Sequence, residues 1–591
     1  MPQYRAPLRD FQFLLHEWLN VSQYKELQGF GDVTPEFCDS LFSEAERFAT
    51  EVLLPINAIG DREGCKFDNG VVTMAPGFKE AYQQYAQGGW GSFTGDPAFG
   101  GQGLPEVLNM PITEMISSCN VSFGLFPALT HGAYNAIHFH GDDALKSTYL
   151  PKMITGEWTG VMGLTEPQSG TDLGLIRTRA EPNGDGSYNV TGTKIFISCG
   201  EHDGAENIIH LVLAKLPDAP AGVKGISLFV VPKFLVNADG SLGERNSYST
   251  GSIEHKMGLH ASPTCVMNYD GAKGWIVGDA HKGLRYMFTM MNEARIYVGM
   301  QGLGLAEISY QNAHAYARDR LQGRALNGAK FPEKPADPLT VHPDVRRMLL
   351  SMRGFTEGAR ALALYAALQV DLSKKHPEAE VRERAEAWVQ LATPILKAYF
   401  TDQGSEVTNT GMQVLGGYGY IKEYGMEQYV RDARIAQIYE GANGIQALDL
   451  VGRKMPQGMG KLLRSFFHPA TEFVARHKNN PDMAEFTKPL HKGIDSLQKA
   501  SLWIAQKGLS NKDEAAGASY DYLTMFGHVM LGYIWAETAA LCLEKKKAGA
   551  TESFYDDKLK VARFFLNKVL PKHYGLLATL TTGVKNLELP D

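Results

Sequence analysis

The chain has few cysteines and no closely spaced set of metal-ligating residues. Its six cysteines stand far apart in the 591-residue sequence, at Cys38, Cys65, Cys119, Cys199, Cys265 and Cys542. No two have the spacing of a zinc ribbon or of a CxxC redox pair, so both kinds of site are excluded and no metal is expected. Sparse thiols in a long chain favour a reducing compartment, and we expect a cytoplasmic protein.

Positive charge is also scarce. Lysine and arginine together number 58 and aspartate and glutamate 65, which gives a net charge of -7. A general nucleic-acid-binding protein needs a basic face, so this balance argues against that class. A local basic pocket for one small anionic ligand remains open.

Long apolar runs are absent as well. The first residues, MPQYRAPLRDFQFLLHEWLNV, include acidic residues and no continuous apolar core, so we expect no signal peptide. The most apolar helical stretch, residues 525–543, is interrupted by His528 and Glu537. We interpret it as a buried helix of a bundle, and no transmembrane segment is predicted.

Common nucleotide and nucleophile motifs are missing too. The sequence contains no GxxxxGK[ST], no HExxH and no GxSxG. The glycines of GLGLAE (302–307) stand inside a helical pattern without a preceding strand, which indicates close helix packing rather than a dinucleotide loop. HFHGDD (138–143) ends an apolar helix at a turn, and capping explains it better than metal binding.

What is present is a helical chain interrupted by one β-rich region. Short β-prone runs at 187–198, 207–216 and 225–234 are separated by turn residues, which is typical of a small antiparallel β-domain. Helical spacing resumes after it, with a loop at 325–340. The fold class is therefore α+β, mostly α. The predicted segments are an N-terminal arm (1–36), a helical N-domain (37–158), the β-domain (159–281), a helical bundle (282–455) and an appended helical domain (456–591).

The appended domain is expected to contain three amphipathic helices. They are predicted near 485–510, 518–548 and 555–583, after a linker at 455–460. Each has one apolar stripe, so each needs partners to bury it. We expect them to pack on the rest of the chain.

Two stretches carry most of the chemical information. In QIYEGANGIQALDL (437–450), Glu440 stands between Tyr439 and a glycine turn, where it acts either as a base or as the cap of a helix that begins near Ile445. GVMGLTEPQSGTDLGLIRTRA (160–180) offers backbone N–H groups and hydroxyls in quick succession. Such a loop suits a heteroatom-rich ring or an anionic tail, or it is a plain strand-to-turn connection.

In their order along the chain, TEPQSGTD, the β-domain, GGYGY and YEGANGIQ resemble the acyl-CoA dehydrogenase family. GDDALKSTYLPKMITGEW (141–158), EHKMGLHASPTCVMNYD (254–270) and YARDRLQGR (316–324) agree with it. The resemblance covers about residues 40–455. The two extra ends resemble a long bacterial branch whose members act on fatty acyl-CoA or on the thioether 3-methylmercaptopropionyl-CoA.

The resemblance implies FAD-dependent α,β-dehydrogenation of an acyl-CoA thioester to the trans-2-enoyl-CoA, on a fold with a helical N-domain, a central antiparallel barrel-like domain and a four-helix bundle. It implies an electron-transfer flavoprotein as acceptor and an oligomer, either a dimer or a tetramer. We expect a homodimer, because the appended helices would occlude the surface between dimers. We expect a straight-chain fatty acyl-CoA of medium to long chain, because general β-oxidation is the commoner task. Alternatives are 3-methylmercaptopropionyl-CoA as substrate, an acyl-CoA oxidase, and a non-catalytic acyl-CoA or flavin binder.

The same resemblance assigns Glu440 as the base that removes the α-proton. Burial beside Tyr439 and an acyl chain would raise its proton affinity toward working pH. Gly441 has no Cβ and lets the backbone approach the thioester, so Tyr439 and Gly441 are expected to contact substrate. Ala442 stands where a threonine is commonest, which removes one hydroxyl directed at the flavin.

Further cofactor contacts are implied by the matching motifs. On the flavin ring side they are Leu164, Thr165, Gly170, Thr171, Phe196 and Ser198. Phe196, where the family often has tryptophan, is either a ring contact or ordinary strand core. For CoA, the resemblance implies Arg295 near the nucleotide and Thr171 near the pantetheine arm. Surface or turn chemistry is the alternative for both.

The resemblance implies that a last group of residues contacts the FAD bound to a neighbouring subunit. It consists of Arg320, Gln322, Gln413, Gly416 and Gly417. A bidentate guanidinium suits the pyrophosphate, while a solvated helix-end charge is the alternative for Arg320. A glycine-capped helix C-terminus is the alternative for the 413–417 segment. The sequence around Gln322 is one residue shorter than the usual pattern, so it departs from the family at this contact.

Overall fold

The computed structural model describes residues 2–590 and divides the chain into two compact units, each assembled from separate stretches of sequence. We name them the sheet unit and the bundle unit and describe each by itself. The sheet unit contains Ala45–Leu104 and Cys119–Tyr297, and the bundle unit contains Met1–Glu44, Pro105–Ser118 and Val298–Asp591. The five segments expected from the sequence stay a prediction.

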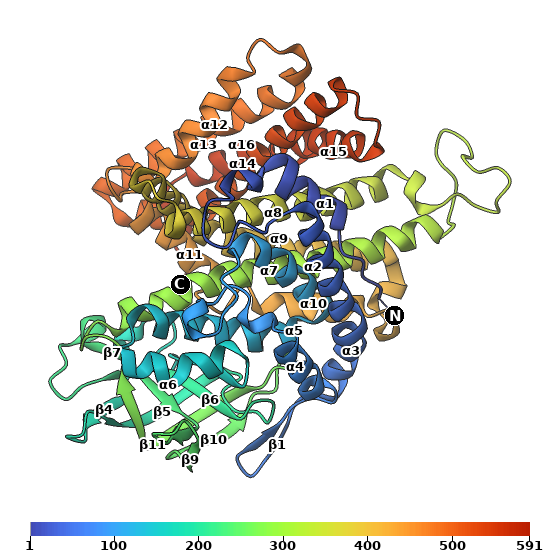
Figure 1. Cartoon of the computed structure of the whole chain (residues 1–591). Helices are drawn as coiled ribbons and strands as arrows, with labels where there is room; N and C mark the ends of the chain where they lie inside the picture. Colours follow the sequence, from blue (N-terminus) through green and yellow to red (C-terminus); the bar gives the residue numbers. More distant parts are fainter. Residues whose placement is uncertain (1, 591) are drawn as a thin grey trace. The chain divides into compact units, whose positions relative to one another are not determined.

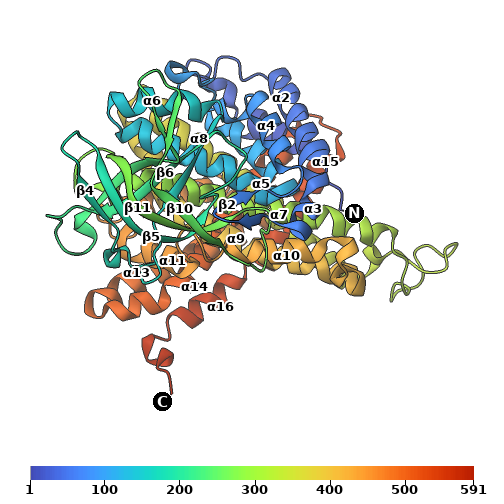
Figure 2. The same cartoon turned by 90° about the horizontal axis from the view of Figure 1, so that it is seen from below.

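The sheet unit is built on a seven-stranded sheet, six of whose strands follow the order β10-β11-β5-β4-β6-β3. Figure 2 labels β4, β5, β6, β10 and β11 of this sheet. Strand β7 pairs with both β11 and β6, so β11, β5, β4, β6 and β7 form a closed ring. The expected strands at 187–198, 207–216 and 225–234 are confirmed as β5, β6 and β7. The strands are β3 (Trp158–Gly163), β4 (Arg179–Pro182), β5 (Tyr188–Ser198), β6 (Asn207–Lys215), β7 (Ile226–Pro232), β10 (Tyr248–Ile253) and β11 (Thr264–Ile276).

The sequence predicted an antiparallel sheet, but the sheet also contains parallel pairs. β3 pairs with β6 in parallel along its whole length, from Trp158 opposite Asn207 to Gly163 opposite Val212. The chain between them, residues 164–206, is long enough for the crossover that parallel strands need. Strands β6 and β7 are buried over nearly all of their length, which explains their continuous apolar runs.

The HFHGDD motif of the sheet unit is a capping site. The carboxylate of Asp142 accepts a hydrogen bond of 2.8 Å from the backbone N–H of Leu145, at the start of α6 (Asp143–Ile154). His138 pairs with Asp96 at 2.9 Å, and His140 with Thr289 at 2.6 Å. Within residues 2–590, no three His, Cys, Asp or Glu side chains are placed to hold a metal ion.

The bundle unit is formed by long helices whose glycines allow close contact. A Cβ on Gly302 would lie 2.5 Å from the carbonyl oxygen of Phe400, and one on Gly404 would lie 2.5 Å from that of Gly302. Close packing is therefore the reason for these glycines, as expected for GLGLAE. The two helices in contact are α7 (Gly283–Asp319), which belongs to this unit from Val298 on, and α9 (Ala379–Leu415). The unit also contains α8 (Pro343–Lys375) and α10 (Met426–Ile435).

Five further helices follow in the same unit. Figure 1 shows them in orange and red beside α8 and α9. The sequence prediction missed the first of them, α12, and joined the last two, which a π-helical turn and Pro571 separate. They are α12 (Lys461–Arg476), α13 (Ala484–Ser510), α14 (Lys512–Lys547), α15 (Ser553–Phe564) and α16 (Lys572–Leu580).

Helix α14 is, among the described residues, the one helix long and apolar enough to cross a membrane by length and composition. Of its most apolar window, 72% is buried inside the structure. His528 forms a hydrogen bond of 2.8 Å with the hydroxyl of Tyr399, and burial lowers the pKa of His528 to about 3. These contacts support the interpretation of α14 as a core helix of the bundle.

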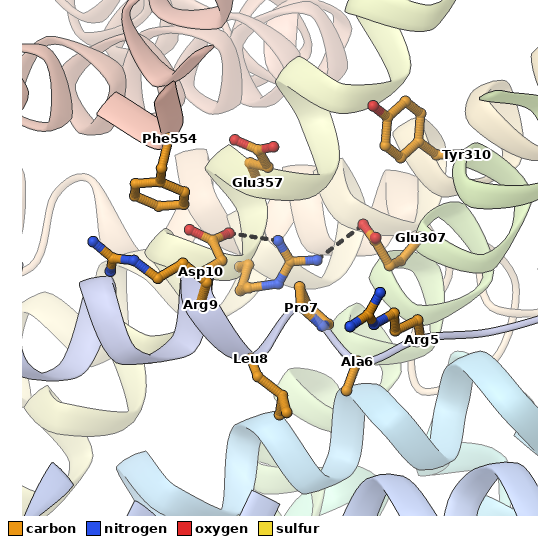
Figure 3. Close-up of a pocket in the computed structure, with 11 residues that line it drawn as sticks. Arg5, Ala6, Pro7, Leu8, Arg9, Asp10, Glu307, Tyr310, Glu357 and Phe554 are labelled. Carbon is orange, nitrogen blue, oxygen red and sulfur yellow. Dashed lines mark hydrogen bonds and ion pairs between the residues drawn. The ribbon is translucent and has the colours of Figure 1, made fainter. Parts of the chain in front are cut away.

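A group of buried charges ties the N-terminal arm into the bundle unit. The guanidinium of Arg360 bonds the carboxylates of Glu114, Glu307 and Asp10, at 2.6, 2.9 and 2.7 Å. Asp10, Glu307 and Arg360 also line a cavity of about 340 Å³, together with arm residues 5–9. Figure 3 shows Asp10 and Glu307 among these lining residues. Sequence reasoning did not find the cluster, because its members are up to 350 positions apart.

Candidate active site

Glu440 lies in a turn between α10 and α11 (Asn443–Asp449). Its φ is +56° and that of Gly441 is +83°, so two successive residues adopt the left-handed conformation. For a glutamate this conformation costs on the order of 1–3 kcal/mol, and such strain clusters at functional sites. Glycine is needed at the second position because a Cβ there would add to the strain.

Side chains from elsewhere in the bundle unit hold this turn. The amide of Gln446 donates hydrogen bonds of 3.1 Å to the carbonyl oxygens of both Glu440 and Gly441. The ammonium group of Lys397 also donates to the carbonyl of Gly441, at 2.9 Å. The strained backbone is therefore fixed by hydrogen bonds that the sequence hypothesis did not include.

Whether Glu440 acts as a base or as a charge near a helix N-terminus stays a prediction. Helix α11 begins at Asn443, two residues earlier than expected, and Ala442 is its N-cap. Glu440 therefore stands two residues before the cap, outside the first helical turn. Its side chain is partly buried.

Tyr439 is anchored by its own hydroxyl. The hydroxyl donates a hydrogen bond to the side-chain carbonyl of Gln301 on α7. Burial, together with the negative charge of Glu440, raises the pKa of Tyr439, so the hydroxyl stays protonated and keeps donating. That Tyr439, Gly441 and Ala442 contact substrate or cofactor stays a prediction.

In the sheet unit, the predicted flavin contacts Leu164 and Thr165 follow strand β3 directly. The carbonyl of Leu164 accepts from the ammonium group of Lys194 at 3.0 Å. The carbonyl of Thr165 accepts from the backbone N–H of Ile195 at 2.9 Å. The start of the TEPQSGTD loop is thus tied to strand β5, next to Phe196.

A buried ion pair that sequence reasoning missed organises this loop. Glu166 and Lys194 are 3% and 0% exposed and lie 2.8 Å apart. Glu166 also accepts from the hydroxyl of Thr178 at 2.6 Å and from the backbone N–H of Arg177 at 2.6 Å. Burial raises the proton affinity of Glu166, but the charge of Lys194 and these bonds outweigh it and lower its pKa to about 2.

Phe196 is presented to solvent by an irregularity in strand β5. The register between β5 and β11 shifts between Cys265 and Met267, so β5 carries one extra residue there. Phe196 has a φ of +58° and a side chain that is 58% exposed. Bulges near active sites re-aim side chains, and a bulky residue in this conformation is rare. The strand-core alternative for Phe196 is therefore wrong.

For the remaining predicted contacts of the sheet unit, the structure gives position and burial. Gly170 and Thr171 are exposed in the loop, and Ser198 is partly buried where β5 pairs with Thr264. Arg295 is 4% exposed, with its guanidinium 5.6 Å from the ring centroid of Phe288. The assignments to flavin and CoA stay predictions for these four residues.

The group assigned to a neighbouring subunit's FAD lies on the bundle unit. The guanidinium of Arg320 is 5.6 Å from the ring centroid of the exposed Tyr418. That tyrosine follows Gly416 and Gly417 directly, at which an added Cβ would meet nothing within 4 Å. Gln413, whose carbonyl accepts from the N–H of Gly416, is exposed. Residues 413–417 therefore form a helix C-terminus whose glycines leave room for a ligand.

Gln322 belongs to a loop organised by a buried carboxylate. Its backbone N–H donates to the carbonyl of Asp337 at 2.9 Å. Asp337 accepts from the backbone N–H groups of Ala325, Lys330 and Phe331, and its pKa is lowered to about 2 against the effect of burial. The cofactor contact of Gln322 stays a prediction.

Comparison with known domain families accounts for most of the chain. Residues 38–157 match the acyl-CoA dehydrogenase N-terminal domain, 161–272 its middle domain and 281–455 its C-terminal domain. Residues 466–589 match the acetyl-CoA dehydrogenase C-terminal-like domain. The four matches follow one another in the order of the predicted segments.

Comparison with proteins similar over the whole chain gives the same result as the domain matches. A 3-methylmercaptopropionyl-CoA dehydrogenase from Ruegeria pomeroyi is 42% identical over 96% of this chain and 96% of its own. The chain belongs to the acyl-CoA dehydrogenase family. A broad-specificity linear acyl-CoA dehydrogenase from Mycobacterium tuberculosis is 33% identical over 97% of this chain and 96% of its own. Members of this family are enzymes that act on acyl-CoA.

The solved structures show the same fold. An acyl-CoA dehydrogenase from Bacillus anthracis, complexed with FAD, has a TM-score of 0.75 and 21% identity over 95% of this chain and 90% of its own. FAD is the cofactor of this acyl-CoA dehydrogenase family. The sheet unit fits a flat ring, because the exposed Phe196 offers an aromatic face beside the anchored start of the TEPQSGTD loop.

Proposed function

We propose that this acyl-CoA dehydrogenase converts an acyl-CoA thioester to the trans-2-enoyl-CoA, with Glu440 as the base that removes the α-proton. The observation that carries the proposal is the left-handed Glu440–Gly441 turn, a strained conformation that the surrounding hydrogen bonds maintain. Strained backbone of this kind clusters at functional sites, which supports a role for Glu440 beyond packing.

The chain's own groups account for the proton transfer. The α-proton of a thioester is a very weak acid, so the carboxylate must be held at contact distance in a fixed direction. Glu440 takes this proton, and the electron pair of the broken C–H bond forms the new C=C bond as the β-hydrogen leaves as hydride. Bound FAD supplies the two-electron acceptor, at N5, for that hydride. A backbone N–H at the Glu440 turn then binds the thioester oxygen as negative charge develops.

In the sheet unit, Leu164, Thr165, Phe196 and Ser198 would hold the flavin ring. The ion pair of Glu166 and Lys194 keeps the loop in place for them. Arg320, Gln413, Gly416 and Gly417 would bind the adenosine and pyrophosphate end of FAD. A planar guanidinium suits pyrophosphate, and open glycines let a ligand approach the backbone.

For the substrate we propose a straight-chain fatty acyl-CoA of medium to long chain, used in β-oxidation in the cytoplasm. The similarity to a broad-specificity linear acyl-CoA dehydrogenase supports a straight chain. A second candidate is 3-methylmercaptopropionyl-CoA, which the 42% identical relative favours. The two differ in the sulfur atom and in the length of chain that the pocket must accept.

Anaerobic flavin reduction tests this function. We expect the yellow absorbance of the FAD-loaded enzyme to bleach on mixing with acyl-CoA, and fastest with a straight chain of medium to long length. The panel runs from butanoyl- to octadecanoyl-CoA and includes 3-methylmercaptopropionyl-CoA. Bleaching fastest with the thioether assigns the second substrate, and no bleaching with any thioester rejects the dehydrogenase.

For the electron acceptor we propose an electron-transfer flavoprotein, because this is the partner that the family resemblance implies. The same experiment, repeated in air, separates this from an oxidase. A dehydrogenase protects its reduced flavin from oxygen, so we expect no release of hydrogen peroxide during turnover without an added acceptor. Stoichiometric peroxide assigns an acyl-CoA oxidase instead.

We also propose a homodimer. The group around Arg320 and Tyr418 is exposed on this chain, although the resemblance implies that it binds FAD together with a second subunit. The appended helices α12–α16 would occlude a surface through which dimers associate further. Mass photometry is expected to give twice the 65.0 kDa chain mass, and a stable tetramer contradicts the proposal.

A further inference from the structure

A buried lysine binds the backbone of the turn that carries Glu440. Lys397, on α9, is 0% exposed, and its ammonium group donates to the carbonyl of Gly441 at 2.9 Å and to the side-chain oxygen of Asn443 at 2.8 Å. Taking an ammonium group out of water costs several kcal/mol, which good hydrogen bonds must offset. Both of these bonds end within three residues of Glu440.

Further hydrogen bonds join this network to the residues on both sides of the turn. The amide of Asn443, which follows the turn, donates to the carboxylate of Asp402 at 2.7 Å and to the hydroxyl of Thr401 at 2.9 Å. Gln437, which precedes the turn, donates to the same oxygen of Asp402 at 2.7 Å. The backbone N–H of Asn443 also donates to the carbonyl of Gln437 at 3.0 Å. Asp402 therefore clamps the two ends of the segment that carries Glu440.

The appended helices supply the last member of the network. The hydroxyl of Tyr520, on α14, donates a hydrogen bond of 2.6 Å to the second carboxylate oxygen of Asp402. Asp402 is thereby held from both sides, by the turn on one oxygen and by α14 on the other. Tyr520 is 43% exposed, so its ring is not a core element whose loss would collapse the packing.

We infer that Lys397, Asn443, Asp402 and Tyr520 form a positioning network for the carboxylate of Glu440, and that the appended helices take part in catalysis through Tyr520. The inference rests on the proposed function of Glu440. A strained turn relaxes when its hydrogen bonds are removed. A shift of about 1 Å in a reacting group can cost about 100-fold in rate.

Two substitutions test the network. Tyr520→Phe removes only a hydroxyl, and Lys397→Met removes the ammonium group while keeping most of the side-chain length. We expect the rate of anaerobic flavin reduction to fall about tenfold in Tyr520→Phe and about 100-fold in Lys397→Met, with little change in KM, because misplacement affects the transition state. Hydrogen–deuterium exchange is expected to accelerate in the peptide 437–446 and not throughout the bundle unit.

Tyr574→Phe is the matched control, because this tyrosine is also exposed in the appended helices and takes no part in the network. It should behave as the wild type in both measurements. Wild-type rates and exchange in Tyr520→Phe overturn the inference, and this variant decides the question if Lys397→Met does not fold. Acceleration spread over the whole unit also overturns it, since that indicates general destabilisation. A fully active Glu440→Gln variant would reject the proposed function itself.

Discussion

Replacing Glu440 with glutamine is expected to abolish turnover while the purified protein keeps its yellow flavin. Glutamine has the same size and the same capacity for hydrogen bonds at its carbonyl, but it cannot accept the α-proton. General base catalysis contributes on the order of 10²–10⁴-fold, and we expect the rate of flavin reduction by acyl-CoA to fall by about 10⁴-fold. The bound substrate should still perturb the flavin spectrum, because binding and proton transfer are separate steps.

The matched control is Glu423→Gln, which makes the same chemical change at an exposed glutamate of the same unit. Flavin content, thermal stability and rate should equal those of the wild type. A near-normal rate in Glu440→Gln would contradict the assigned role, whatever the flavin content. Loss of flavin in Glu440→Gln would instead show that the turn is needed for folding of the cofactor site.

The sequence predicted the parts of this fold that depend on local pattern. Strands β5, β6 and β7 lie within one or two residues of their predicted bounds, because each is an apolar run ended by turn residues. The close packing at Gly302 was also predictable, since a glycine inside a helical pattern without a preceding strand has few other uses.

Other elements were not predictable in the same way. Helix α12 contains Pro469 in its interior, and a proline weakens the local helical signal although the helix continues through it. The parallel pairing of β3 with β6 depends on the crossover of the chain and not on either strand's own residues.

For the candidate site, the motif residues were predictable and their supports were not. Glu440 and Phe196 stand in recognisable sequences, although nothing local shows that both adopt left-handed backbone. Lys194 meets Glu166 across 28 positions, and Lys397 meets Gly441 across 44. A buried lysine in a sequence gives no sign of which distant oxygen it binds. Such partners become visible only when the fold brings them together.

The largest effect on stability is expected from Arg360→Met. Arg360 is 1% exposed, and its guanidinium faces three buried carboxylates, those of Glu114, Glu307 and Asp10. Without Arg360, Asp10 keeps the buried ammonium group of Lys558, but Glu114 and Glu307 lose their cation. Removing one partner of a buried ion pair typically costs about 3–5 kcal/mol. We expect a clear fall in the midpoint of urea unfolding of the bundle unit. Arg347→Met, at an exposed arginine on the same helix, should change stability by less than about 0.5 kcal/mol.

The pH dependence of this variant gives a sharper test. Burial raises the pKa of Glu114 from its ordinary value of 4.5 to about 7, although Arg360 opposes the shift. The folded state therefore binds more protons than the unfolded state between about pH 4.5 and about pH 7, and stability from this group falls as pH rises through that window. Without the guanidinium the folded pKa is higher still, so in Arg360→Met the loss of stability should continue above about pH 7. An Arg360→Met protein that is as stable as the wild type at high pH would show that these carboxylates do not depend on Arg360.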